Sequence, residues 1–555
     1  MFSEKYDLSG VWDFTFLQSP FAEFCVTELS FDSSAPVPGC FDLLPGKFLK
    51  RGTGVYRRSV DNIGGMIALT LEGLGLRGKV FWDKQLISEI DCAFSQRVLR
   101  FDAGETGKHE LIIAVNNEFD DSPSSMFFRN YDFYAHGGIY RKVYIYKIYE
   151  FDLEYLKILP IDPYTGTVSV ELKLWGDAEN CQDASATFDD NCQELKCQLH
   201  NGTMKEVLQV PNPRLWSPQS PYLHKIKIKV KEKIFTAEFG LRSIEVKKGE
   251  LFLNGNKLFL AGVNRHDAHP DFGYAIPLSI QVQDVLMLKA AGFNCIRGCH
   301  YPQSNDFLSL CDRVGMLVWE ESLAWGNVES SMTDELFQKH QLQENHAMAL
   351  KSINHPCVIM WGFLNECCSN LPTSRPLIKS LTEMLHNTDP TRPVTYGSHQ
   401  LTSDCCLDLI DVISFNTYPG WYREGTDQFF DPTTVKTHLE ELEKFASDKK
   451  YKDKALLISE IGAEAMPGLR GGHRWSEDYQ ADLLVYVMQY VKNSPRWSGA
   501  LLWQYCDSRT YISNASQFRS AGFNFKGLVD SHRQPKEAFR RVTVLLKEYN
   551  EKNKS

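Results

Sequence analysis

The sequence has no surplus of basic residues and no long apolar run. Its 60 lysines and arginines are outnumbered by 70 aspartates and glutamates, which gives a formal net charge of −10. Without a basic footprint, a DNA- or RNA-binding function is not expected. No stretch approaches the ~18 consecutive apolar residues of a membrane span, and Met1–Asp7 lacks the basic and apolar regions of an export signal. We therefore expect no nucleic-acid partner and no membrane partner.

Evenly framed cysteine pairs are also missing. The fifteen cysteines are an odd number, and Cys367-Cys368 and Cys405-Cys406 stand side by side instead of in CxxC pairs. A disulfide framework does not have this spacing. The sequence predicts reduced thiols, which fits a cytoplasmic protein.

Length and composition are those of a globular protein with several domains. At 555 residues the chain exceeds what one hydrophobic core usually organises, so two or three domains are expected. Hydrophobic residues make up 43% and charged residues 23%, which argues against long disordered tracts.

The first 243 residues are rich in short β-branched and aromatic runs separated by turns. Val55–Val60 and Met66–Gly73 are examples, and alternating strands such as Thr167–Leu172 follow after residue 148. This spacing is typical of antiparallel sheets. We expect two β-sandwiches in series, residues 1–148 and 149–243, the second having the size of an immunoglobulin-like domain.

Residues 244–555 show the alternation of a (β/α)8 barrel. Compact apolar strands alternate with longer amphipathic runs such as Ile280–Ala291 and Thr333–Ile353, which is typical of parallel βα units. The eight expected strands are Leu258–Asn264, Cys295–His300, Met316–Glu321, Val358–Glu366, Val394–Ser398, Val412–Tyr418, Ala455–Ile461 and Ala500–Asp507.

Catalytic side chains of such barrels lie at the carboxyl ends of the strands, a face that we call the mouth of the barrel. The side chains expected there are His300, Glu321, Glu366, Tyr418, Glu460 and Trp503. All six are expected to gather around one site.

Two of these residues form a candidate catalytic pair. Glu366 ends the strand that begins at Val358, and Glu460 ends the strand that begins at Ala455. A charge beside such apolar runs is costly unless it has a purpose or a partner. Taken alone, each is equally well a solvated glutamate at a strand end, but two opposed glutamates suit the cleavage of a glycosidic bond. Glu464 is a competing candidate, and Glu460 is preferred because it ends the strand itself.

Two segments resemble glycoside hydrolase family 2. Asn354–Glu366 is similar to the acid/base signature of this family, and Asn294–Pro302 is similar to its other pattern, from which it departs at Gly298. The resemblance implies a jelly-roll domain, an immunoglobulin-like domain and a catalytic barrel, the same order as above. It also implies that Glu366 protonates the leaving oxygen and that Glu460 forms a covalent glycosyl-enzyme, so that the pKa of Glu366 must be raised while Glu460 stays ionised.

The resemblance assigns roles to four neighbours of this pair. Asn365 is expected to bind the sugar 2-hydroxyl, and Tyr418 to donate to the nucleophile. His300 is expected to bind the substrate or a catalytic carboxylate, and Trp503 to stack on a sugar face. Each has a plainer alternative, such as a turn asparagine, a core aromatic or a strand-end histidine.

The substrate is suggested by Asn524 and Lys526, which form an Asn-x-Lys motif after the eighth strand. In this family the motif resembles the carboxylate clamp for β-D-glucuronides, which implies a retaining exo-glycosidase for these substrates. Further residues that the resemblance places at the sugar are Asp132, in the segment Asn130–Arg141, and Asn416, Trp421 and Tyr422, in the segment Phe415–Arg423.

The match has departures that keep alternatives open. Ser520 stands where an arginine is often found, and Arg519 precedes it, so a register shift in that loop is one way to restore the contact. A β-galacturonidase or mixed β-hexuronidase, and less so a β-galactosidase, are the alternative enzymes. An inactive carbohydrate-binding protein is the alternative outside enzymes.

The remaining expectations concern the mouth, cofactors and assembly. The short stretch Trp325–His346 favours an open mouth that accepts varied aglycones. His266 and His269 have no convincing partners for a metal site, so neither a metal nor another cofactor is expected. The expected substrate is a small β-glycoside, and the expected assembly is a homo-oligomer.

Overall fold

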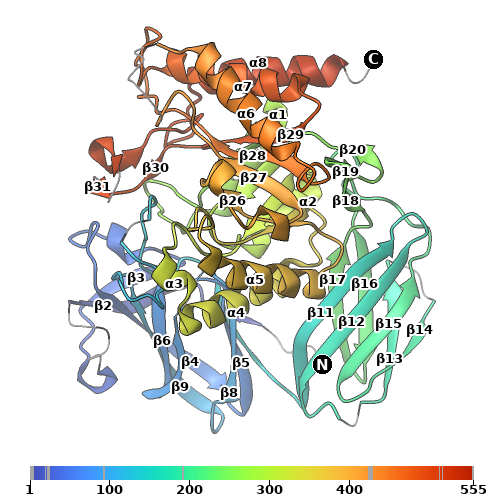
Figure 1. Ribbon diagram of the computed structural model, residues 1–555. Coiled ribbons are helices and arrows are strands. Elements are labelled where there is room, and N and C mark those ends of the chain that lie inside the picture. Colours follow the sequence, from blue (N-terminus) through green and yellow to red (C-terminus); the bar gives the residue numbers. More distant parts are fainter. Residues whose placement is uncertain are drawn as a thin grey trace.

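The structure is a computed structural model that describes residues 5–18, 21, 25–91, 94–129, 131–179, 181–189, 193–422, 429–511, 513–514 and 517–552. Two β-sandwiches lie side by side below a barrel that is surrounded by helices (Figure 1). The N-terminal sandwich is blue, the second sandwich is cyan to green, and the barrel runs from green to red.

The N-terminal sandwich packs two antiparallel sheets, ordered β3-β2-β4-β9-β6-β7 and β1-β10-β5-β8. Its core includes Trp12, Tyr56, Ile67, Leu111 and Ile145. The strands are β1 (Tyr6–Asp7), β2 (Gly10–Leu17), β3 (Ser33–Val37), β4 (Thr53–Ile63), β5 (Met66–Leu71), β6 (Arg77–Trp82), β7 (Gln85–Ile90), β8 (Arg97–Asp102), β9 (Gly107–Asn116) and β10 (Val143–Lys147).

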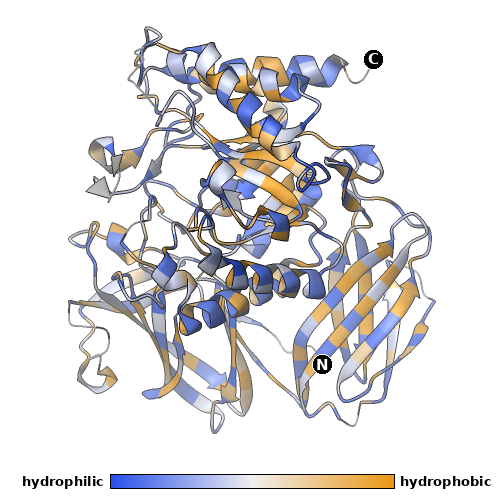
Figure 2. Ribbon diagram, viewed as in Figure 1, coloured by the Kyte–Doolittle hydropathy of each residue, from blue (hydrophilic) through white to orange (hydrophobic). Residues whose placement is uncertain are grey.

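The second sandwich packs the sheet β11-β12-β15 against the sheet β14-β13-β16-β17. Its strands alternate between apolar and polar residues, as Figure 2 shows, because only one face of each sheet meets the core. The strands are β11 (Phe151–Asp162), β12 (Thr167–Gly176), β13 (Asp183–Phe188), β14 (Leu195–Gln198), β15 (Thr203–Gln209), β16 (His224–Val230) and β17 (Lys233–Phe239). A small sheet of β18 (Ile244–Lys247), β19 (Glu250–Leu253) and β20 (Asn256–Lys257) then leads into the barrel.

The barrel is one parallel sheet ordered β25-β24-β23-β22-β21-β29-β28-β27-β26. Its strands are β21 (Leu260–Arg265), β22 (Cys295–Gly298), β23 (Leu317–Glu321), β24 (Val358–Gly362), β25 (Val394–Thr395), β26 (Gly397–Ser398), β27 (Val412–Asn416), β28 (Ala455–Ile461) and β29 (Trp497–Leu502). β25 and β26 are two halves of one strand position, since they flank Tyr396 and pair with β24 and β27, respectively. The eight strand positions confirm the predicted fold class, with the exact domain boundaries remaining a prediction.

Helices cover the outside of the barrel and follow its strands along the chain (Figure 1). The barrel strands are buried on both faces, which explains their nearly continuous apolar runs (Figure 2). The helices are α1 (Leu278–Ala291), α2 (Asn305–Val314), α3 (Glu329–Met332), α4 (Glu335–Ser352), α5 (Arg375–Thr388), α6 (Pro432–Ala446), α7 (Glu477–Asn493) and α8 (Glu537–Lys552). Among the described residues, no helix has both the length and the apolar character that crossing a membrane requires.

Short elements complete the connections. The 3-10 helices are η2 (Val26–Glu28), η3 (Phe41–Leu43), η4 (Pro372–Ser374), η5 (Leu401–Ser403), η6 (Leu407–Leu409) and η7 (Ser520–Gly522). The short strands after the barrel are β30 (Ser508–Arg509), β31 (Ser513–Asn514), β32 (Gln517–Phe518) and β33 (Phe523–Asn524).

The predicted carboxyl ends of four strands are wrong by several residues. His300, Glu366, Tyr418 and Trp503 lie just beyond β22, β24, β27 and β29, instead of ending these strands. At β24 the reason is the backbone, because Glu366 has φ 53°, in the left-handed region, which is incompatible with an extended strand. The loops after the strands therefore orient these side chains.

The sandwiches are tied to the barrel by buried polar contacts. Trp216 donates its indole N–H to the carbonyl oxygen of Asp312 at 2.9 Å. Arg141 donates from Nη2 to the carbonyl oxygen of Pro302 at 2.8 Å and pairs with Asp267 at 3.4 Å. The contacts of Arg141 hold the loop before β10, which carries Asp132, against the mouth of the barrel.

Candidate active site

Glu366 is a half-buried carboxyl at the mouth of the barrel. Its backbone N–H donates to the carbonyl oxygen of Gly397 at 2.8 Å, which fixes the loop after β24 to the neighbouring strand. Asn416 donates from Nδ2 to Oε1 of Glu366 at 2.9 Å. Burial raises the pKa of Glu366, and the hydrogen bond from Asn416 opposes this rise.

Glu460 lies near the end of β28 and is buried. Arg297 donates from Nη1 to its Oε1 at 2.7 Å, and the Tyr418 hydroxyl donates to its Oε2 at 2.7 Å. Burial and the negative charge of Glu366 raise the pKa of Glu460 to about 8, although Arg297 and Tyr418 lower it.

The two glutamates titrate as a pair, because the charge of one raises the pKa of the other. The part of the rise at Glu460 that the charge of Glu366 causes is present only while Glu366 is ionised. When the pair carries a single negative charge, the hydrogen-bond donors around the two carboxyls determine which of them is ionised. Glu460 accepts from a cation and a phenol, whereas Glu366 accepts from the neutral amide of Asn416. The site therefore favours an ionised Glu460 beside a protonated Glu366.

Arg297 joins the polar groups beneath this pair. Its guanidinium is fully buried and lies 4.6 Å from the ring centroid of Trp319. It donates to Glu321 at 2.9 and 3.0 Å, and to Oδ1 of Asn365 at 2.7 Å. Burial raises the pKa of Glu321 to about 7 in spite of Arg297. One arginine thus fixes the orientation of Glu460 and of the residue before Glu366.

Asn365 has a donor that the described residues do not satisfy. Its Oδ1 accepts from Arg297 at 2.7 Å and from Asn416 at 3.0 Å, which assigns the orientation of the amide. Its buried Nδ2 has no partner among the described residues. An unsatisfied buried donor is uncommon in a folded protein and indicates a ligand position beside Glu366.

His300 and Trp503 form a stacked pair at the same face, with ring centroids 5.4 Å apart and an angle of 14° between the rings. Nδ1 of His300 lies 2.8 Å from Oε1 of Glu321. Nε2 of His300 lies 3.9 Å from Oε1 of Glu460 and forms no hydrogen bond within the described part of the chain. His300 thus presents a second unsatisfied nitrogen next to Glu460.

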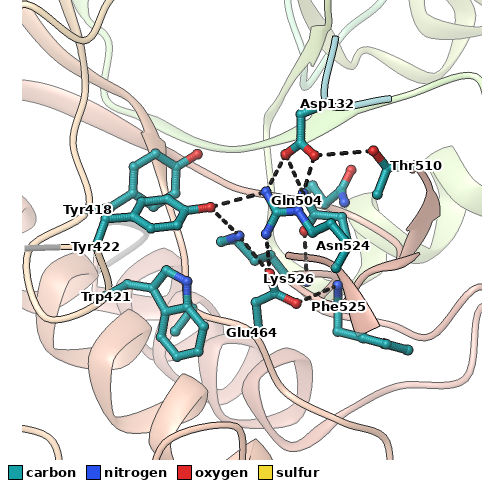
Figure 3. Close-up of polar contacts among 12 residues, drawn as sticks. Asp132, Tyr418, Trp421, Tyr422, Glu464, Gln504, Thr510, Asn524, Phe525 and Lys526 are labelled. Atoms are coloured by element: carbon teal, nitrogen blue, oxygen red, sulfur yellow. Dashed lines mark hydrogen bonds and ion pairs between the residues drawn. The ribbon is translucent and has the colours of Figure 1, made fainter. Parts of the chain in front are cut away.

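A second polar group, which we call the Lys526 cluster, lies next to Tyr418, the residue that donates to Glu460 (Figure 3). Lys526 donates from Nζ to the Tyr422 hydroxyl at 2.7 Å and to Oε1 of Glu464 at 3.2 Å. Asn524 donates from Nδ2 to Oδ2 of Asp132 at 3.3 Å. The cluster consists of Asp132, Tyr422, Glu464, Arg519, Asn524 and Lys526.

Arg519 enters this cluster from the loop before η7. It pairs with Asp132 and Glu464, and its Nη2 lies 3.2 Å from the Tyr422 hydroxyl. Arg519 and Lys526 thus share Glu464 and the Tyr422 hydroxyl as partners. The register shift considered from the sequence stays a prediction.

Aromatic rings connect the two groups. Tyr418, which binds Glu460, makes an edge contact with Tyr422 at 5.1 Å between ring centroids. Nζ of Lys526 lies 4.8 Å from the ring centroid of Tyr422, 5.9 Å from that of Trp421 and 6.0 Å from that of Tyr418. Tyr418 thus contacts Glu460 through its hydroxyl and Tyr422 through its ring. The structure therefore brings the predicted residues Glu460, Trp421, Tyr422 and Lys526 together around Tyr418.

Three charged residues of the site are absent from the predicted set. They are Arg297, Arg519 and Glu464. Arg297 stands three residues before His300 in the motif, so its position on β22 was a usable signal. Glu464 was compared only with Glu460 as a nucleophile. Asn130 and Arg423, which belong to matched segments, lie outside the described residues.

Gly298 has a structural reason for its departure from the family pattern. A Cβ atom at this position would lie 2.5 Å from Cγ of Gln303. Gln303 is fully buried and donates from Nε2 to the carbonyl oxygen of Tyr301 at 3.0 Å. The glutamine occupies the space that a larger residue at 298 would need.

Two buried groups have the residue types of metal ligands. In each, one ligand atom per residue lies within 4.8 Å of the others: the first is His266, Cys299 and His300, and the second is Cys40, Asp42 and His136. The first shares His300 with the site described above. The expected absence of a metal stays a prediction.

The fold and the site define a class: a (β/α)8 barrel with two interacting glutamates at its mouth, preceded by two β-sandwiches, as in multidomain glycoside hydrolases. The family model described as "Glycosyl hydrolases family 2, TIM barrel domain" matches residues 244–551, and the one described as "Glycosyl hydrolases family 2" matches residues 157–242. The chain belongs to glycoside hydrolase family 2.

Several relatives carry uronide-related names. β-Glucuronidase of Mus musculus is 28% identical over 428 residues, which are 73% of this chain and 63% of the mouse protein. The match therefore spans less than two thirds of that relative. β-Glucuronidase of Streptococcus agalactiae is 24% identical over 608 residues, covering 99% of this chain and 98% of the relative.

Among solved structures, a β-galacturonidase from Eisenbergiella tayi, bound to galacturonate, superposes with a TM-score of 0.89 at 29% identity. The superposition covers 99% of this chain and 98% of that one. A β-glucuronidase from Faecalibacterium prausnitzii shares the fold, with a TM-score of 0.86 at 24% identity and coverage of 98% of both chains.

Proposed function

We propose that this protein is a retaining exo-glycosidase that hydrolyses β-D-glucuronides. The observation that carries the proposal is the placement of Lys526 beside the glutamate pair, with Tyr418 between them. Tyr418 donates to Glu460 at 2.7 Å, and its ring centroid lies 6.0 Å from Nζ of Lys526. A buried cation next to a pair of carboxyls suits a sugar that itself carries a carboxylate.

The reaction needs one proton donor and one nucleophile. Protonated Glu366 transfers its proton to the glycosidic oxygen while Glu460 attacks the anomeric carbon, so that the bond to the aglycone breaks and a covalent glycosyl-enzyme forms. Glu366, now ionised, takes a proton from water, and the resulting hydroxide displaces Glu460 with overall retention. Arg297 and Tyr418 hold Glu460 ionised for the first step.

The unsatisfied donors beside the pair fit this chemistry. The free Nδ2 of Asn365 is suited to the sugar 2-hydroxyl, a contact that strengthens as charge develops at the anomeric carbon. Nε2 of His300 is suited to another hydroxyl of the same ring. One face of the Trp503 indole stacks on His300, and a contact of Trp503 with the sugar stays a prediction.

Recognition of the sugar acid is assigned to the Lys526 cluster. Lys526 and Arg519 supply positive charge, and Asn524 and Tyr422 supply hydrogen-bonding groups. Asp132 reaches the cluster from the N-terminal sandwich, and Trp421 lines it. In the family pattern Asn524 and Lys526 form the carboxylate clamp, Trp421 and Tyr422 line the uronate pocket, and Asp132 reaches the sugar.

A β-galacturonidase is the second candidate. The galacturonate-bound relative from Eisenbergiella tayi matches 99% of this chain at 29% identity, which favours a hexuronide in either case. The two hexuronides differ only at carbon 4, so one recognition site for the carboxylate serves both.

A panel of four substrates tests the proposal. Nitrophenyl β-D-glucuronide, galacturonide, galactoside and glucoside are each assayed with the wild-type enzyme and with the Lys526→Ala and Glu366→Ala variants. We expect uronide cleavage by the wild type, a loss of about 100-fold in kcat/KM for uronides in Lys526→Ala, and loss of all activity in Glu366→Ala. A wild type that cleaves only neutral glycosides would contradict a uronide substrate.

We also propose a cytoplasmic location. Sγ of Cys405 lies only 3.9 Å from Sγ of Cys406 without a disulfide, which suits a reducing compartment. The homo-oligomer stays a prediction, and sedimentation velocity of the purified protein tests it.

A further inference from the structure

Glu464 is a buried carboxylate that binds both cations of the Lys526 cluster (Figure 3). It is only 1% exposed. Its Oε1 accepts from Nζ of Lys526 at 3.2 Å and from Nη1 of Arg519, and its Oε2 accepts from the backbone N–H of Phe525 at 3.2 Å. Burial opposes ionisation, but Lys526 and Arg519 outweigh it and lower the pKa of Glu464. In the free protein this residue is therefore an anion.

The formal charges of four side chains cancel in this cluster. Arg519 pairs with Asp132 as well as with Glu464, and Lys526 pairs with Glu464. Two cations thus face two carboxylates. A hexuronide that entered would bring a third carboxylate to the same two cations, in a place where little water is present to screen it.

Glu464 contacts Nζ of Lys526, the atom that a substrate carboxylate would bind. A uronate oxygen that binds Lys526 must approach Nζ, which already donates to Tyr422 and Glu464. Asp132 is tied to the other side of Arg519 and to Thr510 and Asn524, so it is held by more donors that do not involve Lys526. Of the two acids, Glu464 is the one whose contact with Lys526 competes with the substrate.

We infer that Glu464 is an internal substitute for the substrate carboxylate and sets the affinity for hexuronides. In the free protein it neutralises Lys526 and Arg519, which would otherwise be buried without sufficient counter-charge. On binding, the hexuronide replaces it at Nζ of Lys526, and Glu464 moves away from Nζ towards Arg519. This inference rests on the proposed function, and it deepens that function by assigning a specificity-determining residue.

The substitution Glu464→Gln tests the inference because it removes the charge and keeps the size. We expect KM for the nitrophenyl hexuronide that the wild type prefers to fall on the order of tenfold, with little change in kcat. KM for the nitrophenyl galactoside is expected to stay unchanged, since a neutral sugar does not meet the repulsion. An unchanged or higher KM for the hexuronide would overturn the inference, because Glu464 would then only position Lys526 and Arg519.

A double-mutant cycle supplies the matched control. In a Lys526→Ala background the competition for Nζ no longer exists, so Glu464→Gln is expected to lower the hexuronide KM by a clearly smaller factor than in the wild-type background. A fall in KM of the same size in both backgrounds would contradict competition at Lys526. Inhibition by free hexuronate gives the same comparison without turnover, and its Ki is expected to follow KM.

A complex of the wild-type protein with free hexuronate tests the inference even if the variant fails to fold. We expect the uronate to accept from Nζ of Lys526 and Glu464 to lie beyond hydrogen-bonding distance of that atom. A complex that keeps the Lys526–Glu464 contact at 3.2 Å overturns the inference. Absence of hexuronide turnover by the wild type would overturn the proposed function as well, whereas turnover with an unchanged variant KM overturns the inference alone.

Discussion

Arg297 binds Glu460 directly, with Nη1 2.7 Å from Oε1, and the same guanidinium donates to Asn365 at 2.7 Å. It is therefore a positioning residue for the groups on both sides of the bond to be cleaved. Because its other nitrogen atoms bind Glu321 at 2.9 and 3.0 Å, the guanidinium cannot turn without breaking several contacts. The orientation of the proposed nucleophile is thus set by β22.

Arg297→Lys is expected to lower kcat by about 100-fold, because an ammonium group cannot reach Glu460, Asn365 and Glu321 together. KM for the preferred hexuronide should change much less, since the Lys526 cluster stays intact. Steady-state kinetics measures both values. The control is Arg375→Lys, which alters a half-exposed arginine that pairs with Asp408 instead of with a residue of the site. Wild-type kcat in Arg297→Lys would refute the positioning role.

The Tyr418 hydroxyl makes the pH profile testable. It donates to Glu460 and so lowers the pKa of this carboxyl, against the rise caused by burial and by Glu366. Removing this hydroxyl in Tyr418→Phe raises the pKa of Glu460. As the pH falls, Glu460 is therefore protonated at a higher pH in the variant than in the wild type. The acid limb of the kcat/KM profile is therefore expected to move to higher pH by up to about one unit.

Tyr422→Phe is the matched control for this shift. Tyr422 makes an edge contact with Tyr418 at 5.1 Å, but its hydroxyl accepts from Lys526 at 2.7 Å. We expect this variant to raise KM for the hexuronide while the acid limb stays in place. An equal shift in both variants would mean that the effect does not pass through the hydrogen bond to Glu460.

Gly298 offers a prediction on stability. Gly298→Ala is expected to lower the free energy of unfolding by about 1–3 kcal/mol, because the added Cβ lies 2.5 Å from Cγ of the buried Gln303. Urea unfolding measures the change. In a Gln303→Ala background the same substitution should cost clearly less, since the space is then empty. Equal costs in both backgrounds would show that the clash is not the cause.

The architecture was predictable because each strand and helix carries its own periodic signal. The eight strand positions and the two sandwiches follow from apolar runs and alternation, which local chemistry determines. The ends of the strands were less predictable: Glu366 adopts φ 53° in a loop, and no residue type near it signals that turn.

The charged partners of the site were harder to predict, because they depend on contacts between distant segments. Arg519 meets Asp132, which lies in the N-terminal sandwich sequence, and Glu464, which follows β28, meets Lys526, which follows β29. Neither contact has a fixed spacing in the chain. From the sequence, Glu464 was considered only as an alternative nucleophile to Glu460. Its contacts with the two cations Arg519 and Lys526 become visible only in the structure.

Asn365 is expected to act through the sugar 2-hydroxyl. Its Oδ1 is held by Arg297 and Asn416 at 2.7 and 3.0 Å, which leaves Nδ2 without a described partner beside Glu366. Asn365→Ala should lower kcat/KM by about 100-fold on a nitrophenyl hexuronide, because this contact strengthens in the transition state. The corresponding 2-deoxy substrate cannot make this contact even in the wild type. On that substrate the kcat/KM values of the wild type and of Asn365→Ala should therefore differ much less. Losses of equal size on both substrates would mean that the alanine acts only by disturbing Arg297, and the role of the amide as a ligand for the sugar would have to be abandoned.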